Sequence, residues 1–522
     1  MTTPKVVVKG RGETAALAET DEVLVPARNP AGDLLYRLFS FPVMCMFLLG
    51  AVIFAFCVKQ FAEPDIWWHL RDAAYLWQHH VFPSVDTYSF GAAGSPWLNH
   101  EWLSEIPFFM AFRTMGLPGI LLVYFVLLLL IYAGVYHRSC TAGADCKTAA
   151  VTTLLAIFLG VVSIGPRVLL FGWLCMVCLL NVLDRFERTG KGLWILPPLF
   201  ALWINLHGSW VFGLVVLALT ISAGLVEGEW GLVVSRRWSP GELRTLLLAS
   251  VTSVAALFIN PFGYRLVMYP FNFLFHQQSN VQYVEEWQSV DLSTGNGKVA
   301  LFVIFGLLAA ALFSKRQWKL EDALLTVFAL WAGLAHARFL FFIGLTVVPI
   351  LAPHLQLFPP YERELDKPWL NAAIMAAVIA GIVVFYPSGA KLQQKVDEVF
   401  PTSAIRFLQS RHDQGRIFNQ YLWGGYMEWT APELQTFIDG RADIFVYNGT
   451  LDDHRRATTI NAPLEVMNKY KIDYALLQPD RPLTYLIGHS AGWRPIYKDK
   501  VAVVFERIPP GAITSQPATQ AN

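Results

Sequence analysis

The sequence carries little charge for its length. Only 15% of its 522 residues are Asp, Glu, Lys or Arg, against about 25% in an ordinary soluble domain. The 40 basic and 39 acidic residues nearly cancel, which excludes a nucleic-acid-binding protein that depends on bulk charge and a strongly acidic or basic tail. Apolar residues make up 55% of the chain and the mean hydropathy is +0.43, so we expect a membrane protein.

Cysteine is scarce, and a signal peptide and internal repeats are absent. The six cysteines lie in or beside apolar runs, and none falls in the polar segments 59–116, 260–297 or 388–522, so no disulfide is expected within those segments. Cys175 and Cys178 have a CxxC spacing, but without a second pair they do not indicate a metal or redox site. Residues 1–36 are polar and lack the apolar core of a cleavable signal, so the first apolar span is expected to be an uncleaved anchor.

The sequence is rich in long apolar runs. About 20 residues of helix cross the hydrocarbon core of a bilayer, and residues 37–387 contain about eleven such runs. The run 193–225 is too long for one helix, so we divide it at Asn205-Leu206-His207-Gly208, where polar residues and a glycine interrupt it. The expected spans are 37–58, 117–136, 148–165, 167–183, 192–206, 209–226, 244–259, 298–314, 321–335, 339–358 and 369–387.

Lys and Arg in the short loops predict the orientation. A cytoplasmic N-terminal tail, residues 1–36, places most basic loop residues inside, among them Arg138, Lys147 and Arg316. The outer loops, although longer, hold few. An odd number of spans then places residues 388–522 outside the membrane.

The segment after the last span predicts a small α/β domain. Strand-like runs at 416–419, 434–438 and 474–478 alternate with helix-like runs at 463–470 and 482–489. A hairpin is expected from Trp493–Tyr497 and Val501–Arg507, with its turn at Lys498-Asp499. We assign residues 388–508 to this domain, and we expect the Pro-, Ser- and Gln-containing segment 509–522 to be disordered.

Polar residues gather at the outer ends of the predicted spans, which favours one cavity that opens outward at the membrane boundary. A role in helix capping or snorkelling is the alternative for each single residue. The group comprises Asp65, His69, His100, Glu101, Arg167, Asn205, His207, Asn260, Arg265, His336 and Arg338.

The first outer loop, residues 59–116, carries the strongest chemical signal. It opens with Glu63-Pro64-Asp65 and continues into a helix-like stretch, 66–80, whose tryptophans suit the headgroup region of a bilayer. A second motif, Trp97-Leu98-Asn99-His100-Glu101-Trp102, again places an acid and an imidazole between tryptophans. Interfacial anchoring does not require Asp65 or Glu101. Carboxylates at an apolar boundary are candidates for a raised pKa and for general-base catalysis.

This layout resembles the GT-C superfamily of membrane glycosyltransferases, which use polyprenyl-phosphate-linked sugars. The motifs EPDIWWHL, WLNHEW, WINLHG, GRIFNQYLWGGYMEW and FIDGRAD are similar to those of poorly characterised bacterial membrane proteins assigned to that superfamily, over most of the chain. The resemblance implies a GT-C-like fold in a bacterial cytoplasmic membrane, with a periplasmic C-terminal domain. The WWD-type acceptor motif of oligosaccharyltransferases is absent from 388–522, which argues against glycosylation of asparagine sequons.

The resemblance also implies roles for single residues. The catalytic acid of the superfamily matches the Glu63-Pro64-Asp65 element, with Asp65 favoured, although Pro64 interrupts the acidic pair. We expect inverting transfer from a polyprenyl-phosphate sugar to a lipid, glycan or protein. Arg167 and Arg338, with His336 and more weakly Arg265, are expected to meet the donor phosphate. We expect His69, His100, Glu101, Asn205 and His207 to bind substrate. Carboxylates and imidazoles also suit Mg²⁺ or Mn²⁺, although no spacing requires a metal ion.

Other functions compete with this hypothesis. A transporter or flippase would also place ionisable groups in membrane spans, but we expect such groups throughout the bilayer depth, and two related halves. A non-catalytic envelope scaffold would use residues 388–522 for recruitment. A polymerase or ligase of lipid-linked glycans would use the same cavity. The aromatic run Tyr421–Trp429 and Asp439-Gly440-Arg441 fit either a substrate-facing lip or, as we favour, a docking patch with an Asp439–Arg441 ion pair.

Overall fold

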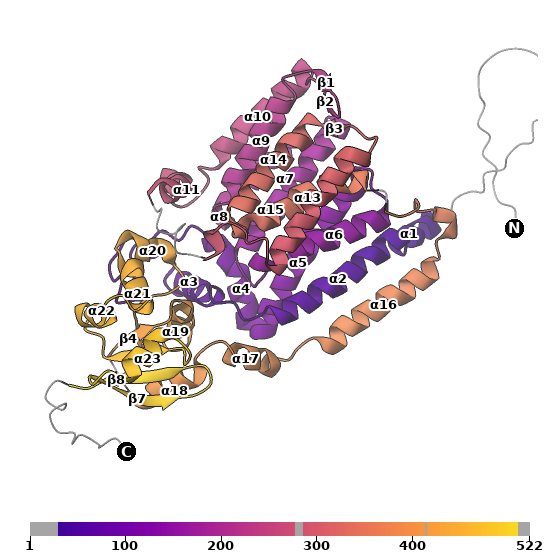
Figure 1. Cartoon of the computed structure of the whole chain (residues 1–522). Helices are drawn as coiled ribbons and strands as arrows, with labels where there is room; N and C mark the ends of the chain where they lie inside the picture. The colour runs from indigo at the N-terminus through magenta and orange to yellow at the C-terminus, as the bar shows by residue number, and fades with distance from the viewer. Residues whose placement is uncertain (1–29, 277–284, 356, 413–414, 510–522) are drawn as a thin grey trace, which may run out of the picture.

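The computed structural model describes residues 30–276, 285–355, 357–412 and 415–509. A bundle of long helices makes up most of the molecule, and a smaller domain that contains a sheet packs against one end of it (Figure 1). Most of the predicted cytoplasmic tail, and the predicted disordered segment from residue 510 onward, lie outside the described residues.

Each predicted span coincides with a helix of the bundle. Among the described residues, seven helical stretches are long and apolar enough to cross a membrane, and α8, α9, α10 and α14 are shorter, with 11, 14, 17 and 16 residues. The chain is a multi-pass membrane protein. The bundle comprises α2 (Phe41–Lys59), α5 (Leu117–Thr141), α6 (Cys146–Gly160), α7 (Leu169–Thr189), α8 (Leu196–Leu206), α9 (Trp210–Ala223), α10 (Pro240–Ala256), α13 (Gly295–Phe313), α14 (Leu320–Ala335), α15 (Leu340–Leu351) and α16 (Pro368–Phe385).

Local sequence explains where several of these helices begin and end. The predicted break after Asn205 is confirmed, because α8 ends at Leu206 and α9 begins at Trp210. The Asp145 side chain accepts a hydrogen bond from the Lys147 amide at the start of α6, which satisfies a backbone donor that the helix leaves open. Gly190, with φ of +67°, ends α7 in the left-handed conformation that glycine adopts most easily.

The first outer loop forms two helices, α3 (Ile66–His79) and α4 (Trp102–Met115), which pack on each other and against the smaller domain. The Trp67 ring lies 4.9 Å from the Tyr426 ring, and the Trp68 ring lies 6.1 Å from the Trp97 ring. Both tryptophans are buried, whereas Trp77 is exposed. The prediction that Trp67 and Trp68 anchor the loop in the bilayer interface is therefore wrong, because protein side chains cover both rings.

The C-terminal domain holds a five-stranded mixed sheet with the strand order β5-β4-β6-β8-β7. β4 pairs in parallel with β5 and β6, whereas β8 pairs antiparallel with β6 and β7. Every strand-like and helix-like run predicted for this segment coincides with an element of the same type. The strands are β4 (Arg416–Asn419), β5 (Gln435–Thr436), β6 (Tyr474–Leu477), β7 (Trp493–Lys498) and β8 (Val503–Arg507).

The helices of this domain include several that the sequence pattern did not predict. The short helices between Gly389 and Thr458 escaped prediction because each has only a few turns. The full set is α17 (Gly389–Asp397), α18 (Thr402–Ser410), α19 (Gly424–Thr430), α20 (Ala442–Tyr447), α21 (Thr450–Thr458), α22 (Pro463–Lys469) and α23 (Pro482–Gly488).

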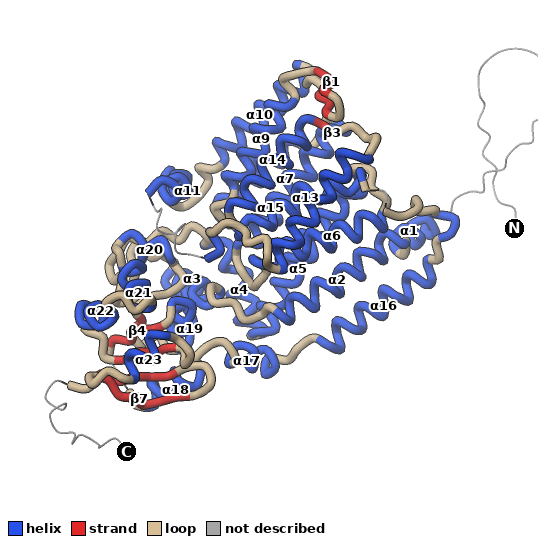
Figure 2. Tube along the Cα trace, in the orientation of Figure 1, coloured by secondary structure: helices blue, strands red, loops and turns tan. Residues whose placement is uncertain are grey.

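Strands lie at both ends of the molecule (Figure 2). A small sheet of β1 (Gly228–Trp230), β2 (Val233–Ser235) and β3 (Trp318–Lys319) caps the end of the bundle away from the C-terminal domain.

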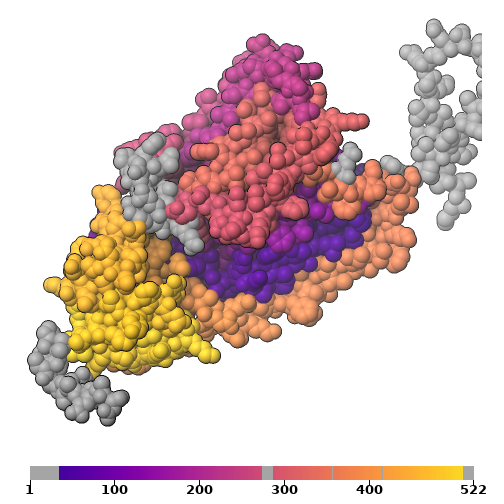
Figure 3. Space-filling view, viewed as in Figure 1, coloured from indigo at the N-terminus to yellow at the C-terminus, as the bar shows by residue number. Residues whose placement is uncertain are grey.

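The remaining helices are α1 (Pro30–Leu38), which leads into α2, and α11 (Tyr264–His276), which lies outside the bundle. All six cysteines are free. The C-terminal domain forms a compact block at its end of the bundle (Figure 3).

Candidate functional site

The acidic element after the first span lies beside a buried arginine. Arg167, in the turn before α7, has its Nε 2.8 Å from Glu63 Oε1. Its Nη1 donates a hydrogen bond of 2.7 Å to Glu286 Oε1, in a short 3₁₀ helix (Glu285–Trp287). Gly165 allows this close packing, because a Cβ there would lie 2.6 Å from Glu63 Oε2. Two carboxylates from distant parts of the chain thus share one guanidinium.

Asp65 begins α3 and lies under the C-terminal domain. A Cβ on Gly440 would lie 2.6 Å from Asp65 Oδ1, so only a glycine lets the two segments approach this closely. The Tyr421 hydroxyl donates a hydrogen bond of 3.1 Å to the Gly440 carbonyl and holds this backbone in place. Burial raises the pKa of Asp65 above its usual range, and the positive charge of Arg167 partly opposes that rise. The C-terminal domain therefore forms one wall around this carboxylate.

Arg338 presents a second, unpaired positive charge. Its guanidinium lies over the Trp287 ring, 4.4 Å from the centroid, and His336 Nδ1 lies 2.6 Å from the Trp287 carbonyl oxygen. Among the described residues, no carboxylate forms an ion pair with Arg338 and no acceptor binds its guanidinium. A half-buried cation that lacks an internal partner is suited to an anionic ligand.

Three imidazoles surround the Glu101 carboxylate. The Nε2 atoms of His207, His100 and His69 lie 3.3, 3.8 and 3.9 Å from its oxygens. The Ser209 amide donates to His207 Nδ1, so a neutral His207 carries its proton on Nε2, where it faces Glu101. Burial raises the pKa of Glu101 to about 8 and lowers that of His207 to about 3. The cluster is consequently close to neutral near pH 7.

The histidine cluster continues inward to a buried acid. His69 Nδ1 lies 3.0 Å from Glu105 Oε1, and the Asn99 amide donates to Glu105 Oε2 at 2.9 Å. Burial raises the pKa of Glu105 well above its usual value. Charges of Arg338 and Asp65 also act on the pKa of Glu101, so electrostatic interactions connect the cluster with the Asp65 region.

A buried arginine joins the first outer loop to the C-terminal domain. Arg441 donates from Nε and Nη2 to both oxygens of Asp439, at 2.9 and 2.6 Å, and from Nη2 to Asp86 Oδ1 at 2.7 Å. Glu428 Oε1 lies 3.9 Å away, and the guanidinium lies over the Tyr88 ring, 4.8 Å from its centroid. The Asp439–Arg441 ion pair is confirmed, and it belongs to the docking patch that we favoured over a substrate-facing lip.

Many of the carboxylates and imidazoles of this region interact with other protein side chains. Among the described residues, no group of three or more His, Cys, Asp or Glu is arranged to hold a metal ion. Glu63 and Glu286 face Arg167, and the three imidazoles face Glu101, so these potential ligands already have partners within the protein.

Solved structures with a similar arrangement belong to the archaeal oligosaccharyltransferase of Archaeoglobus fulgidus. One, tethered to an acceptor peptide that contains an NVT sequon, has a TM-score of 0.51 and 12% identity over 89% of this chain and 74% of that chain. The chain has the GT-C fold. A second structure, AglB with an inhibitory peptide and a dolichol-phosphate, has a TM-score of 0.48 and 11% identity over 91% and 74%. No protein-family model matches this chain, and no curated protein matches its sequence.

The GT-C fold brings most of the predicted site residues to one end of the bundle. Asn205 is there but is fully engaged, since its Oδ1 accepts from the Trp102 indole and its Nδ2 donates to two backbone carbonyls. Arg265 is exposed at the start of α11, and it makes no ion pair with any described residue. His336 contacts the backbone of Trp287 and so positions the ring beneath Arg338.

Sequence reasoning missed two members of this candidate site, Glu105 and Glu286. Glu105 follows Glu101 by one helical turn, a spacing that places both on the same face of α4. Glu286 lies in the polar segment 260–297, where an acid beside a tryptophan repeats the pattern of the first loop. Tyr421 was recognised only as part of the aromatic run Tyr421–Trp429, and its place over Asp65 follows from the docking of the C-terminal domain.

We expect Glu101→Gln to change the pH dependence of stability. An unfolded Glu has a pKa of about 4.3, whereas folded Glu101 titrates at about 8. Between these values the native state keeps a proton that the unfolded state has released, so the free energy of unfolding falls as the pH rises. The variant should match wild type near pH 4, below the unfolded pKa, and exceed its Tm near pH 8.5, measured in detergent. Glu398→Gln, at an exposed position, is the control, and equal pH profiles for Glu101→Gln and wild type would contradict the assignment.

Proposed function

We propose that this protein is a membrane glycosyltransferase that moves a sugar from a polyprenyl-phosphate-linked donor to an acceptor at the outer membrane boundary. One observation carries the proposal: at the end of a GT-C bundle, the Asp65 carboxylate interacts electrostatically with Arg338, a cation without an ion-pair partner among the described residues. A base and a phosphate-binding cation are the two groups that such a transfer needs. The fold is that of a superfamily whose members transfer lipid-linked sugars.

In the proposed reaction Asp65 removes the proton from an acceptor hydroxyl. The hydroxyl oxygen attacks the anomeric carbon from the face opposite the phosphate, and the bond between that carbon and the phosphate oxygen breaks, so the configuration inverts. A raised pKa makes Asp65 a stronger base than an ordinary aspartate. The lipid phosphate leaves with its negative charge, which Arg338 and Arg167 stabilise. Glu63 orients Arg167 rather than acting on the acceptor.

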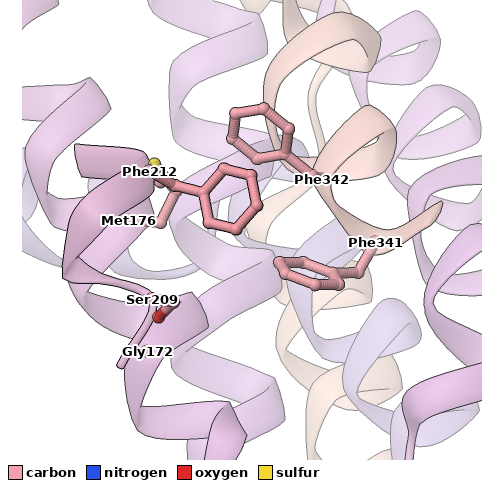
Figure 4. A pocket seen from close by; sticks show the side chains of 6 residues that line it. All are labelled: Gly172, Met176, Ser209, Phe212, Phe341 and Phe342. Carbon is pink, nitrogen blue, oxygen red and sulfur yellow. The ribbon is translucent and has the colours of Figure 1, made fainter. Parts of the chain in front are cut away.

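An apolar region next to these arginines suits the lipid part of the donor. A small cavity between α7, α9 and α15 is lined by Met176, Phe212, Phe341 and Phe342, with Gly172 and Ser209 at its edge (Figure 4). The three phenyl rings face one another across it. Phe341 is three residues after Arg338, so an isoprenoid chain that lies against these helices would bring its phosphate to that arginine.

The histidine cluster is the proposed binding region for sugar or acceptor. His69, His100 and His207 supply neutral donors and acceptors beside Glu101, as polyhydroxylated substrates require. A Mg²⁺ or Mn²⁺ ion, if the reaction uses one, would compete with Arg167 for the carboxylates of Glu63 and Glu286. The acceptor is a lipid, a glycan or a protein, and the lack of a WWD motif disfavours an asparagine sequon.

The proposed location is the cytoplasmic membrane of a bacterium, with the site on the outer side. Arg138, Arg188 and Arg316 lie at the end of the bundle away from the C-terminal domain, and loops rich in Lys and Arg face the cytoplasm. That orientation places Asp65 and the C-terminal domain in the periplasm.

Mass spectrometry of co-purifying lipids tests the donor site. We expect a polyprenyl-phosphate sugar to be enriched on wild type and to fall about tenfold or more on Arg338→Ala and on the Arg167→Ala/Arg338→Ala variant, because a charged hydrogen bond to phosphate contributes about 1.5–3 kcal/mol. Arg113→Ala, at an exposed position on α4, is the control and should retain the lipid.

Two results would contradict the donor site. Equal amounts of a polyprenyl-phosphate sugar on wild type and Arg338→Ala would place the phosphate elsewhere. Bulk phospholipid alone on every protein would remove the main reason to rank a transferase above a flippase or an envelope scaffold.

A further inference from the structure

A second polar cleft lies at the opposite end of the bundle from Asp65. The ends of α5, α7 and α15 and the segment that leads into α14 form its walls. Its open volume is about 80 Å³, which corresponds to roughly two or three water molecules. Four basic and three acidic side chains line it, which is unusual for helices that otherwise face lipid.

Two ion pairs across the walls of this cleft neutralise most of its charge. Arg138 Nε lies 2.8 Å from Asp184 Oδ2 and so joins α5 to α7, while Lys319 Nζ lies 2.6 Å from Glu187 Oε2. Arg138 also donates to the Thr346 carbonyl of α15 at 3.1 Å. The third acid, Asp322, interacts electrostatically with Arg138 and Lys319. These contacts hold together the helices that form the cleft, and they engage its acidic side chains with basic partners.

Arg188 and Arg316 remain without a carboxylate partner among the described residues. Arg316 donates from Nη2 to the Ala142 carbonyl at 2.6 Å, and Arg188 donates from Nε to the Asp184 carbonyl at 3.2 Å. Each guanidinium is thereby oriented by the backbone and keeps further N–H groups for a ligand. Two oriented guanidinium groups match the geometry of a phosphate.

The surroundings of Arg316 indicate a lipid phosphate. Leu312 and Phe313, at the end of α13, have exposed fractions of 76% and 83% and precede Arg316 by only a few residues. Apolar side chains so exposed at the end of a membrane helix face acyl chains. We propose that this cleft binds the phosphate of an anionic phospholipid, with Arg188 and Arg316 on the headgroup and the end of α13 against the acyl chain. Basic pockets between membrane helices commonly bind anionic headgroups.

Lipid titration of the full-length protein in detergent tests this site independently of sugar transfer. Dioleoylphosphatidylglycerol should bind wild type more tightly than dioleoylphosphatidylcholine, and Arg188→Gln/Arg316→Gln should weaken its binding about tenfold or more, given roughly fivefold for each basic group. The control, Arg185→Gln/Lys191→Gln, removes two exposed charges at the same end of the bundle, outside the cleft, and should bind phosphatidylglycerol as wild type does.

Three results would overturn the proposal. Equal affinity of wild type for the two lipids would show that the cleft has no preference for an anionic headgroup. Equal losses in both double variants would assign the effect to general surface charge. Competition by millimolar inorganic phosphate as effective as that by phosphatidylglycerol would identify a site for a soluble oxyanion.

Discussion

Asp65→Asn is expected to abolish most sugar transfer while the protein stays folded and keeps its donor. A general base contributes about 10² to 10⁴ in rate, and an amide cannot accept the acceptor proton. The readout is the release of polyprenyl phosphate in membranes that contain the natural acceptor, alongside the amount of donor that co-purifies with the variant. A loss of turnover with donor retained would separate the base from the phosphate-binding arginines.

The stability of Asp65→Asn should not fall. A loss of turnover can therefore be assigned to the missing base and not to unfolding. Burial raises the pKa of Asp65, so the fold disfavours its charged form and a neutral amide of the same size should be tolerated. The Tm of the variant should equal or exceed that of wild type near pH 8. Asp452→Asn, at an exposed carboxylate of α21, is the matched control and should leave turnover unchanged. Full turnover by Asp65→Asn would exclude Asp65 as the base.

The membrane part of the fold could be predicted from sequence because apolar length alone decides it. A helix in lipid must satisfy its backbone internally, so a run of about 20 apolar residues has few alternatives. The break at Asn205-Leu206-His207-Gly208 was visible for the same reason, since polar side chains are costly within the hydrocarbon region. Asp65, Glu101 and Arg338 stood out against this apolar background, and the structure brings them to one end of the bundle.

The rest of the site depends on contacts between distant segments, which residue patterns do not encode. Trp67 and Trp68 fit a bilayer interface by residue type, yet α19 and the turn that contains Gly440 cover them. Glu286 meets Arg167 across more than a hundred residues of sequence. The short helices α17 to α21 escaped prediction because each has only a few turns, and α19 is positioned by its packing on α3.

Replacement of Arg441 by methionine is expected to cost about 3–5 kcal/mol, because it leaves buried carboxylates without their cation. Asp439 and Asp86 both accept hydrogen bonds from Arg441, and the side chains of all three have an exposed fraction of 0%. Thermal unfolding in detergent, together with limited proteolysis of the C-terminal domain, measures the loss. Arg456→Met, which removes a 45% exposed arginine from α21, should cost at most about 1 kcal/mol.

The charge itself, rather than the packing of Arg441, should account for most of that loss. Asp86→Asn/Asp439→Asn/Arg441→Met removes the cation together with two of its acids, so it leaves fewer buried charges without a partner than Arg441→Met does. We expect this triple variant to recover much of the Tm lost in Arg441→Met. Sugar transfer should not recover together with the Tm. The contacts between Asp439 and Arg441 position the backbone of Gly440, which lies against Asp65, and the triple variant lacks them. A triple variant as unstable as Arg441→Met would instead show that the shape of the guanidinium, stacked on Tyr88 and Trp97, holds the two parts together.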